Sequence, residues 1–393
     1  MQQFNYPTTI YFGEGALKAA VTTIAKRGHR RLLLVTDESL SAMGVADSVA
    51  ALFQEHGVET VLFDGVHPNP LEADVLAGAA CYKAQHCDGI FSVGGGSPND
   101  AAKVIAIAAT HDEPLEKFED CQGGDANVVH PLPAIYSAAT TAGTGSEVGR
   151  SGLVTLARTG RKTIIFHPDL LPKIAILDPA LTMGLPPEIT ASTGVDALSH
   201  NLEAYCARGF HPMADGIALQ GIELVLDSLP RVMKDGGDVM HRSRMLLASA
   251  MGATAFQKGL GAAHSMSNAL TAKFNMHHGT GIALVLPATL AFLERSVGLD
   301  TAERQRLETL QRLFQSYVRD EAPLSVLMHT FITSQGIPMG LEKQGVTLEH
   351  IDELSKIAFE DPTHAGNMLV LNQGDFVRLF RAALPGHIEQ AVW

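Results

Sequence analysis

The sequence predicts two domains, an α/β domain over residues 1–185 and an all-α domain over residues 186–393. Three observations support this prediction. The chain has 393 residues, which is too long for one ordinary hydrophobic core. In the first half, apolar runs alternate with helical patterns, and this order is typical of a parallel sheet with helices on both faces. After Pro186 and Pro187, strand-like runs nearly vanish and amphipathic helical patterns continue to the C-terminus.

The elements of the first domain follow from their apolar patterns and from the residues that end them. Pro179 stops the last strand. Two short runs at 153–157 and 162–166 flank Arg158–Arg161 and predict a hairpin. The other expected elements are strands at 31–37, 60–64, 89–93 and 174–178 and helices at 45–56 and 71–85.

The overall composition limits the classes of function. Hydrophobic residues make up 46% of the chain and charged residues 18%, a composition that can bury a core and argues against disorder. The formal net charge of −13 disfavours binding to nucleic acid, which requires a basic surface. We expect no membrane helix and no signal peptide, because the sequence lacks the apolar runs that both require. None of the four cysteines forms a C-x-x-C pair, so we expect reduced thiols in a cytoplasmic protein.

A glycine-rich turn is the first candidate binding feature. The run Gly94-Gly95-Gly96-Ser97 follows a predicted strand and opens a helix that extends to about Ala109. The glycines let the backbone approach a ligand, while Ser97 suits the helix N-cap and Pro98 the first helical position. The N–H groups and partial positive charge of a helix N-terminus favour a pyrophosphate. The alternative is a tight turn without a ligand.

This turn departs from the usual dinucleotide-binding fingerprint. Asn99 stands where the third glycine of G-x-G-x-x-G would be, and Asp37 precedes the glycines instead of following them. The sequence therefore does not predict a standard Rossmann domain. Asp37 nevertheless ends a strand, where a carboxylate can accept from the adenosine ribose and would repel a 2′-phosphate, so it favours NAD over NADP. A solvated acid that starts a turn is the alternative.

A second loop of small residues, Thr140–Glu147, follows the apolar run 134–136. Hydroxyl groups and free backbone in this loop could contact a phosphate or a nicotinamide. The alternative is a Thr/Gly-rich turn with no ligand. Together with the glycine-rich turn, the loop favours a cofactor site that includes Thr140, Thr141 and Thr144.

The helical half contains a candidate metal site. Asp196 and His200 are 200 − 196 = 4 residues apart on a predicted helix, so they lie on one face. His264 and His278 would complete a set of one carboxylate and three imidazoles, which suits Fe(II) or Zn(II). An open coordination position would let the cation polarise a substrate oxygen. Taken singly, a histidine of this kind is more often a hydrogen-bonded core or surface residue.

The chain resembles the iron-containing (group III) alcohol dehydrogenases over nearly its full length. The resemblance implies an N-terminal nucleotide-binding domain and a C-terminal metal domain of the dehydroquinate synthase-like fold, usually in dimers or larger oligomers. It also implies that Asp196, His200, His264 and His278 are the metal ligands. The motifs that carry it are Gly94–Asp100 with Lys103, Thr140–Glu147, Gly184–Pro187, Gly194–His200 with Glu203, and His277–Gly279. The residues that fall where the family contacts NAD are Asp37, Asn69, Gly96, Ser97, Thr140, Thr141, Lys162 and Leu181.

One position departs from the family pattern. Many members carry a second histidine four residues after the third ligand, and here 264 + 4 = 268 is Asn268. The resemblance therefore leaves the proton carrier open, and His277 is the candidate in this chain; a residue that only supports a ligand, or a surface histidine, is the alternative. Lys258, in the segment that leads to His264, is a candidate to hold an anionic substrate tail; a solvated lysine at a helix end is the alternative.

The predicted function is hydride transfer between NAD(H) and a small primary alcohol or aldehyde, with an acidic tail as the sharper hypothesis. The expected cofactors are NAD and a divalent metal, with Fe(II) favoured over Zn(II), and the expected assembly is a homodimer or larger. Two related enzymes are alternatives: a metal-free reductase of the maleylacetate reductase type and a lyase of the dehydroquinate synthase type. A non-catalytic metal- or nucleotide-binding protein is the alternative from another class.

Overall fold

The computed structural model describes residues 4, 6, 8–298 and 301–386. The chain divides into two compact units, one up to Gly184 and the other from Leu185 onward. Phe4 belongs to the second unit, where its ring packs on His211 with 4.2 Å between the ring centroids.

The first unit is built on a parallel six-stranded sheet with the order β1-β8-β5-β4-β2-β3. This confirms the predicted strands and the α/β class. The strands are β1 (Thr9–Phe12), β2 (Arg31–Val35), β3 (Glu59–Phe63), β4 (Gly89–Gly94), β5 (Ala134–Ala139) and β8 (Ile174–Leu177). The helices are α1 (Ala16–Ala25), α2 (Glu38–Ala42), α3 (Val45–Glu55), α4 (Glu72–Ala84) and α5 (Gly96–Ala108).

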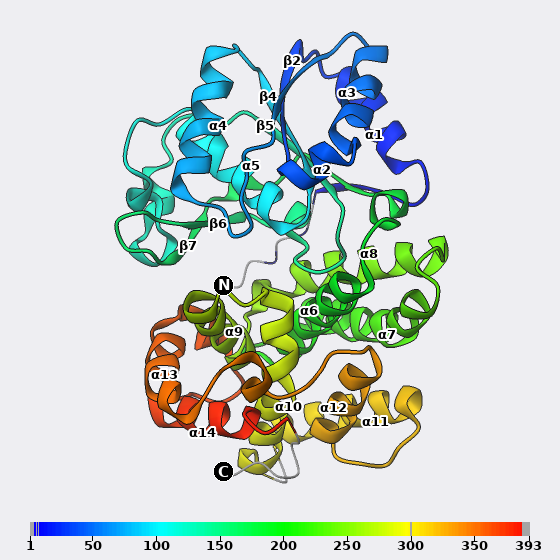
Figure 1. Ribbon diagram of the computed structural model, residues 1–393, viewed down its shortest axis with the longest axis vertical. Helices are drawn as coiled ribbons and strands as arrows, with labels where there is room; N and C mark the ends of the chain where they lie inside the picture. The colour runs from blue at the N-terminus through cyan, green and yellow to red at the C-terminus, as the bar shows by residue number, and fades with distance from the viewer. Residues whose placement is uncertain (1–3, 5, 7, 299–300, 387–393) are drawn as a thin grey trace. The chain divides into compact units, whose positions relative to one another are not determined.

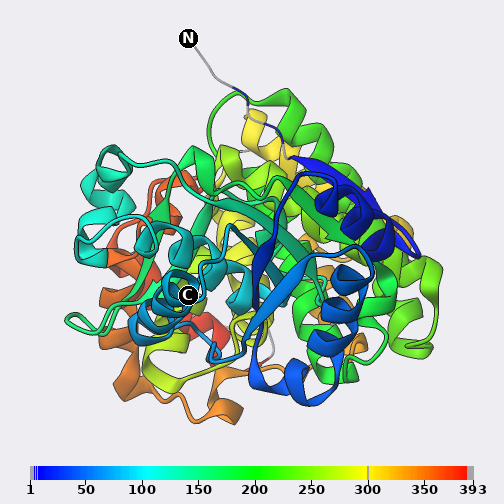
Figure 2. The same ribbon diagram turned by 90° about the horizontal axis from the view of Figure 1, so that it is seen from above.

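Helices cover both faces of this sheet (Figures 1 and 2). Because side chains alternate along a strand, Leu32 and Leu34 of β2 pack in the core under α1 and α3, whereas Leu33 and Val35 pack in the core under α4 and α5. The strands are apolar at consecutive positions because both faces are covered. This explains the uninterrupted apolar runs in the sequence.

The hairpin differs from the prediction in its first strand. β6 spans Ser151–Thr155 and pairs with β7 (Lys162–Phe166), so it begins 153 − 151 = 2 residues earlier than expected. The reason is tertiary: Lys103 Nζ donates to Ser151 O over 2.8 Å. In addition, Gly152 packs so closely on α5 that a Cβ there would lie 2.6 Å from the carbonyl oxygen of Asp100.

The prediction that Ser97 is the N-cap of α5 is wrong. The N-cap is Gly95, which makes no side-chain cap, and the helix begins at Gly96. The turn closes early because the ring of Pro98 packs against Gly94, where a Cβ would approach to 2.4 Å. The N-terminal N–H groups of α5 are therefore not capped by a side chain of the turn. Ser97 Oγ accepts instead from the N–H of Asn69 at 3.3 Å.

The second unit is all-helical in its described residues, as predicted (Figure 1). Its α-helices are α6 (Pro187–Cys206), α7 (Pro212–Lys234), α8 (Val239–Ala255), α9 (Ala262–Phe274), α10 (His278–Ser296), α11 (Ala302–Val318), α12 (Leu324–Ser334), α13 (Ile351–Glu360) and α14 (Gln373–Ala383). α6 packs against α7, α8 and α10, and α9 packs against α10 and α13. Among the described residues, no helix combines the length and apolar character needed to cross a membrane.

Candidate functional site

The four predicted metal ligands converge from three helices of the second unit. Asp196 and His200 lie one turn apart on α6. His264 lies in the first turn of α9, and His278 is the first residue of α10. The contacts of α10 with both α6 and α9 bring these helices together.

All three imidazoles direct Nε2 towards one carboxylate oxygen. The distance from Asp196 Oδ1 is 3.9 Å to His200, 3.9 Å to His264 and 3.7 Å to His278. One ligand atom each from Asp196, His200 and His264 lies within 4.8 Å of the others. Asp196 Oδ1 and His264 Nε2 are buried, and neither atom takes part in a hydrogen bond with any residue that the structure describes. Buried polar atoms are rarely left without partners, so this donor set fits a divalent cation.

Two further side chains fix the orientation of the imidazoles. His264 Nδ1 donates to Glu203 Oε2 over 2.5 Å, and Glu203 Oε1 accepts the N–H of Ala263 over 2.8 Å. The hydroxyl of Ser267 lies 3.2 Å from His278 Nδ1 and donates to the carbonyl oxygen of His278. A proton held on Nδ1 leaves the lone pair on Nε2, which is the atom that a metal binds.

The charges of the site favour an ionised carboxylate. Burial by itself would raise the pKa of Asp196, but the neighbouring His200, His278 and His264 lower it below its ordinary value. The site therefore offers an anionic oxygen among three nitrogen donors. This donor set suits borderline cations such as Fe(II) and Zn(II).

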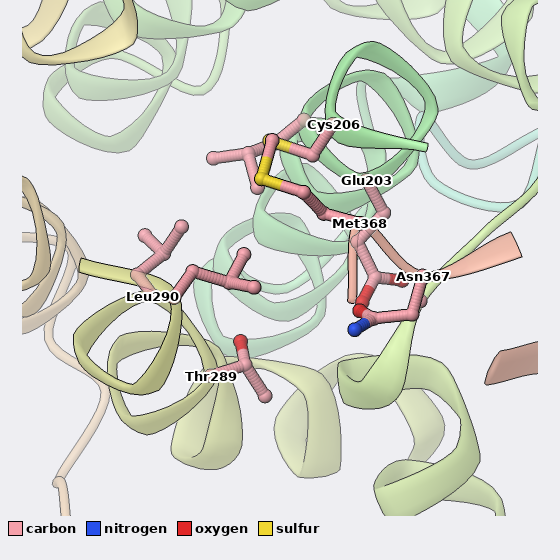
Figure 3. Close-up of a pocket in the computed structure, with 9 residues that line it drawn as sticks. Glu203, Cys206, Thr289, Leu290, Asn367 and Met368 are labelled. Atoms are coloured by element: carbon pink, nitrogen blue, oxygen red, sulfur yellow. The ribbon is translucent and has the colours of Figure 1, made fainter. Parts of the chain in front are cut away.

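A small cavity lies beside Glu203 within the second unit (Figure 3). Its volume of about 10 Å³ corresponds to one water molecule. Figure 3 shows Glu203 and Asn367 on one side of the cavity and Thr289 and Leu290 on another. Its full lining is Leu202, Glu203, Cys206, Gly261, Thr289, Leu290, Leu293, Asn367 and Met368. The orienting carboxylate is thus packed rather than open to solvent.

In the first unit, the predicted cofactor residues gather at the carboxyl edge of the sheet. β2 is followed by a connection to β3 on one side, and β4 by a connection to β5 on the other. The switch point therefore lies between β2 and β4, the place where open α/β sheets bind ligands. Asp37 follows β2, the run Gly94-Gly95-Gly96 ends β4 and begins α5, Thr140 follows β5, and Leu181 follows β8.

The Thr140–Glu147 loop packs directly on the glycine-rich turn. The N–H of Thr140 donates to Gly94 O over 3.0 Å. A Cβ at Gly95 would lie 3.3 Å from the side chain of Thr141, and one at Gly96 would lie 2.7 Å from Thr144 Oγ1. The two loops predicted to bind the cofactor are therefore one packed surface.

Three other predicted residues also meet. Lys162 Nζ donates to Asn69 Oδ1 over 3.2 Å, and the N–H of Asn69 donates to Ser97 Oγ. Asn69 has a φ of 56°, a left-handed conformation that asparagine tolerates.

Asp37 caps α2, since its Oδ1 accepts from the N–H of Leu40 over 2.9 Å. This contact uses one of its two carboxylate oxygens, and the cofactor role of Asp37 stays a prediction.

Beneath this surface lies a charged network whose role the sequence does not reveal. Lys103 is fully buried and donates to Ser146 O at 2.6 Å, Ser146 Oγ at 2.7 Å and Ser151 O at 2.8 Å. Asp100 accepts from Ser146 Oγ over 2.6 Å, and Oε1 of the buried Glu147 has no hydrogen-bond partner in the described part of the chain. Burial lowers the pKa of Lys103 to about 8 and raises that of Glu147 to about 7.

This network should make stability depend on pH. The pKa of Glu147 rises from 4.5 to about 7 on folding, chiefly because of burial. Between these values the folded state holds a proton that the unfolded chain has released, so stability falls as pH rises through this window. We expect Glu147→Gln to lose that fall in a series of melting temperatures from pH 4.5 to pH 7. Glu113→Gln, an exposed change in the same unit, should keep the wild-type profile; identical profiles for all three proteins would contradict the assignment.

The two predicted catalytic side chains occupy different surroundings. His277 is exposed and immediately precedes α10. The side chain of Lys258 is only 2% exposed, and its Nζ donates to Asp215 Oδ1 at 2.5 Å and to Tyr205 O at 3.1 Å. Arg306 binds the other oxygen of Asp215 over 2.7 Å. This placement argues against Lys258 as the holder of a substrate tail, because its charge is already paired inside the unit.

Sequence reasoning missed the orienting role of Glu203, although a signal was present. Glu203 lies 203 − 200 = 3 residues after His200, on the adjoining part of the same helical face. Asn268, which departs from the family pattern, donates to Asp361 Oδ2 over 2.9 Å. No pattern in the sequence links Asn268 to Asp361.

Comparison with known proteins agrees with this architecture. The chain matches the family description "Iron-containing alcohol dehydrogenase" over residues 7–179 and its C-terminal domain over residues 190–384. A 4-hydroxybutyrate dehydrogenase of Cupriavidus necator is 38% identical over 385 residues, covering 96% of this chain and 99% of that protein.

Two solved structures share the fold. An alcohol dehydrogenase from Oenococcus oeni has a TM-score of 0.90 and 28% identity, with 98% of this chain and 100% of that chain covered. A sulfoacetaldehyde reductase from Bifidobacterium kashiwanohense, in complex with NAD+, has a TM-score of 0.85 and 26% identity, with the same coverage of 98% and 100%.

The fold and the possible metal site at Asp196, His200 and His264 define a metal- and nicotinamide-dependent dehydrogenase. The chain belongs to the iron-containing alcohol dehydrogenase family. It is an oxidoreductase with alcohol dehydrogenase and aldehyde reductase activity, and its cofactors are NAD and a divalent metal.

Proposed function

We propose that Asp196, His200, His264 and His278 hold the catalytic cation, with Fe(II) favoured over Zn(II). The observation that carries this proposal is the convergence of three Nε2 atoms within 3.9 Å of Asp196 Oδ1. When bound, the cation supplies a Lewis acid that polarises the substrate oxygen and lowers the pKa of an alcohol. Glu203 and Ser267 keep two imidazoles in the orientation that this task requires.

We further propose that NAD binds at the carboxyl edge of the sheet in the first unit and supplies the hydride acceptor. The uncapped N–H groups at the start of α5 would hold the pyrophosphate, and the free oxygen of Asp37 would accept from the ribose. The packed loop of Thr140, Thr141 and Thr144 supports a surface for the remainder of the cofactor. The full proposed set is Asp37, Asn69, Gly94, Gly95, Gly96, Ser97, Thr140, Thr141, Thr144, Lys162 and Leu181.

His277 is the proposed proton carrier. It is exposed, and it adjoins the ligand His278 at the start of α10. An imidazole in this position can pass the proton of the alcohol to solvent, since its ordinary pKa lies near neutrality. Asn268 cannot do so, because an amide has no titratable proton in this range.

The substrate we favour is a small aldehyde with an acidic tail, together with the corresponding alcohol. Two similar proteins are named for such compounds, 4-hydroxybutyrate and sulfoacetaldehyde. Other relatives are named for a neutral diol, 1,3-propanediol. The preference between these classes is therefore a test of the proposal.

The deciding experiment measures NADH absorbance before and after metal removal. The protein is purified without oxygen, treated with chelator and assayed with neutral and acidic aldehydes, with Fe(II) or Zn(II) then restored. We expect activity to disappear and to return with one metal, and kcat/KM to be highest for an acidic aldehyde. Unchanged NADH oxidation after removal would favour the metal-free maleylacetate reductase type. Phosphate release without net NADH change would favour the lyase.

We also propose a cytoplasmic homodimer. β1 is an edge strand that pairs with β8 alone among the described strands, and Phe12 at its end is 49% exposed. An open strand edge with an exposed aromatic residue favours pairing with a second copy. The four unpaired thiols are consistent with a reducing compartment. Light scattering after size exclusion measures the assembly, and the mass of a single chain would contradict the dimer.

A further inference from the structure

We propose that Asp361 is a positioning residue that holds the metal-binding end of α9 in place. The inference rests on the proposed metal site and extends it to a segment that contributes no ligand. This segment, residues 361–367, follows α13 and contains the short 3-10 helix Pro362–Gly366. We call it the α9 clamp.

Asp361 contacts α9 at two positions that follow the ligand His264. Its Oδ1 accepts from Ser265 Oγ over 3.0 Å, and its Oδ2 accepts from Asn268 Nδ2 over 2.9 Å. Ser265 directly follows His264, and Asn268 lies one helical turn beyond it on the same face. One carboxylate thus binds the side chain of the residue next to the ligand and a second side chain one turn further along the helix.

The opposite end of the clamp holds the first residue of α9. Asn367 Oδ1 accepts the N–H of Ala262 over 3.2 Å. Glu203, which orients His264, accepts the next N–H of the helix, that of Ala263. The clamp also fits closely, because a Cβ at Gly366 would lie 2.8 Å from Leu260 O. Figure 3 shows Asn367 beside Glu203 at the cavity.

The arrangement has a clear consequence for metal binding. Ligand distances must hold to within about 0.2 Å, and His264 projects from the first turn of α9, where intrahelical hydrogen bonds are fewest. Side chains of Glu203, Asn367 and Asp361 supply the missing restraint. Loss of Asp361 should therefore displace His264, although both partners of the hydrogen bond between His264 and Glu203 are still present.

The test compares the affinity for Co(II) of the wild-type protein with that of its variants. Each protein is purified as the holoenzyme, stripped of metal and titrated with Co(II). We expect Asp361→Ala to raise the Kd for Co(II) about 10-fold, the lower end for partners outside the ligand shell, and to change the visible absorption spectrum of the bound ion. Asp361→Asn should recover most of the affinity, because a turned Asn268 amide can bond to it. Glu353→Gln removes another contact with α9, the exposed pair with Lys273, and should leave both readouts unchanged.

The outcomes are distinct. A wild-type affinity and spectrum in Asp361→Ala would overturn the inference and leave the metal site intact. A wild-type chain that binds no divalent cation would overturn the proposed function as well. If Asp361→Ala does not fold by circular dichroism, Asn268→Ala removes one bond alone, and we expect about a threefold rise in Kd; no rise would again overturn the inference.

Discussion

Asp196→Asn is expected to lower kcat/KM by about 10³-fold and to prevent metal retention, the largest functional effect of any single change in this chain. Asp196 carries the negative charge of the site, and its Oδ1 faces three imidazoles at 3.7–3.9 Å. The amide has nearly the same shape but removes the charge. Four neutral donors then remain where one anion and three imidazoles stood.

Metal content and activity are measured together in this experiment. NADH binding, followed by fluorescence, should stay near the wild-type value, because the proposed cofactor residues belong to the other unit. Asp375→Asn provides the control, since it neutralises another buried carboxylate of the helical unit that caps α14. It should cost stability but retain the metal. Full metal content in Asp196→Asn would contradict the assigned ligand.

Most of the fold could be predicted from the sequence, because the patterns that indicate its elements are local. Uninterrupted apolar runs such as 31–35 report a strand that is buried on both faces. The proline pair at 186–187 forms the N-cap and first residue of α6 and coincides with the loss of strands. Where the prediction failed, the cause was tertiary: Ser151 begins β6 because Lys103 holds it, and Ser97 is not a cap because Pro98 packs on Gly94.

The candidate site could be predicted from the sequence only in part. Asp196 and His200 are linked by helical spacing, whereas no spacing links His264 and His278 to them, and the resemblance to the family is what implies that all four are ligands. Partners separated by long stretches of chain carry no spacing signal. His264 and Glu203 are 61 residues apart, and Asn268 and Asp361 are 93 apart. For Lys258, the sequence showed a charge near a ligand but not the carboxylate of Asp215 that pairs with it.

The largest expected loss of stability comes from Lys103→Met. The ammonium is 0% exposed and makes three hydrogen bonds that join α5 to Ser146 and Ser151. Methionine fills similar space but removes every donor and leaves Asp100 and Glu147 buried without their cation. Breaking a buried ion pair in this way costs about 3–5 kcal/mol. For a unit of this size, that corresponds to a fall of about 10 °C in melting temperature.

Calorimetry tests this expectation when Lys103→Met is compared with Lys83→Met. Lys83 pairs with Asp112 at 3.4 Å, but its side chain is 48% exposed and that of Asp112 is 98% exposed, so its loss should change stability by less than about 1 kcal/mol. Adding Glu147→Gln to Lys103→Met should recover part of the loss, most of all above pH 7, where Glu147 would otherwise ionise. Equal melting temperatures for the two lysine variants would show that Lys103 does not hold the Thr140–Glu147 loop to α5. A recovery that grew towards low pH would contradict Glu147 as the acid left unpaired.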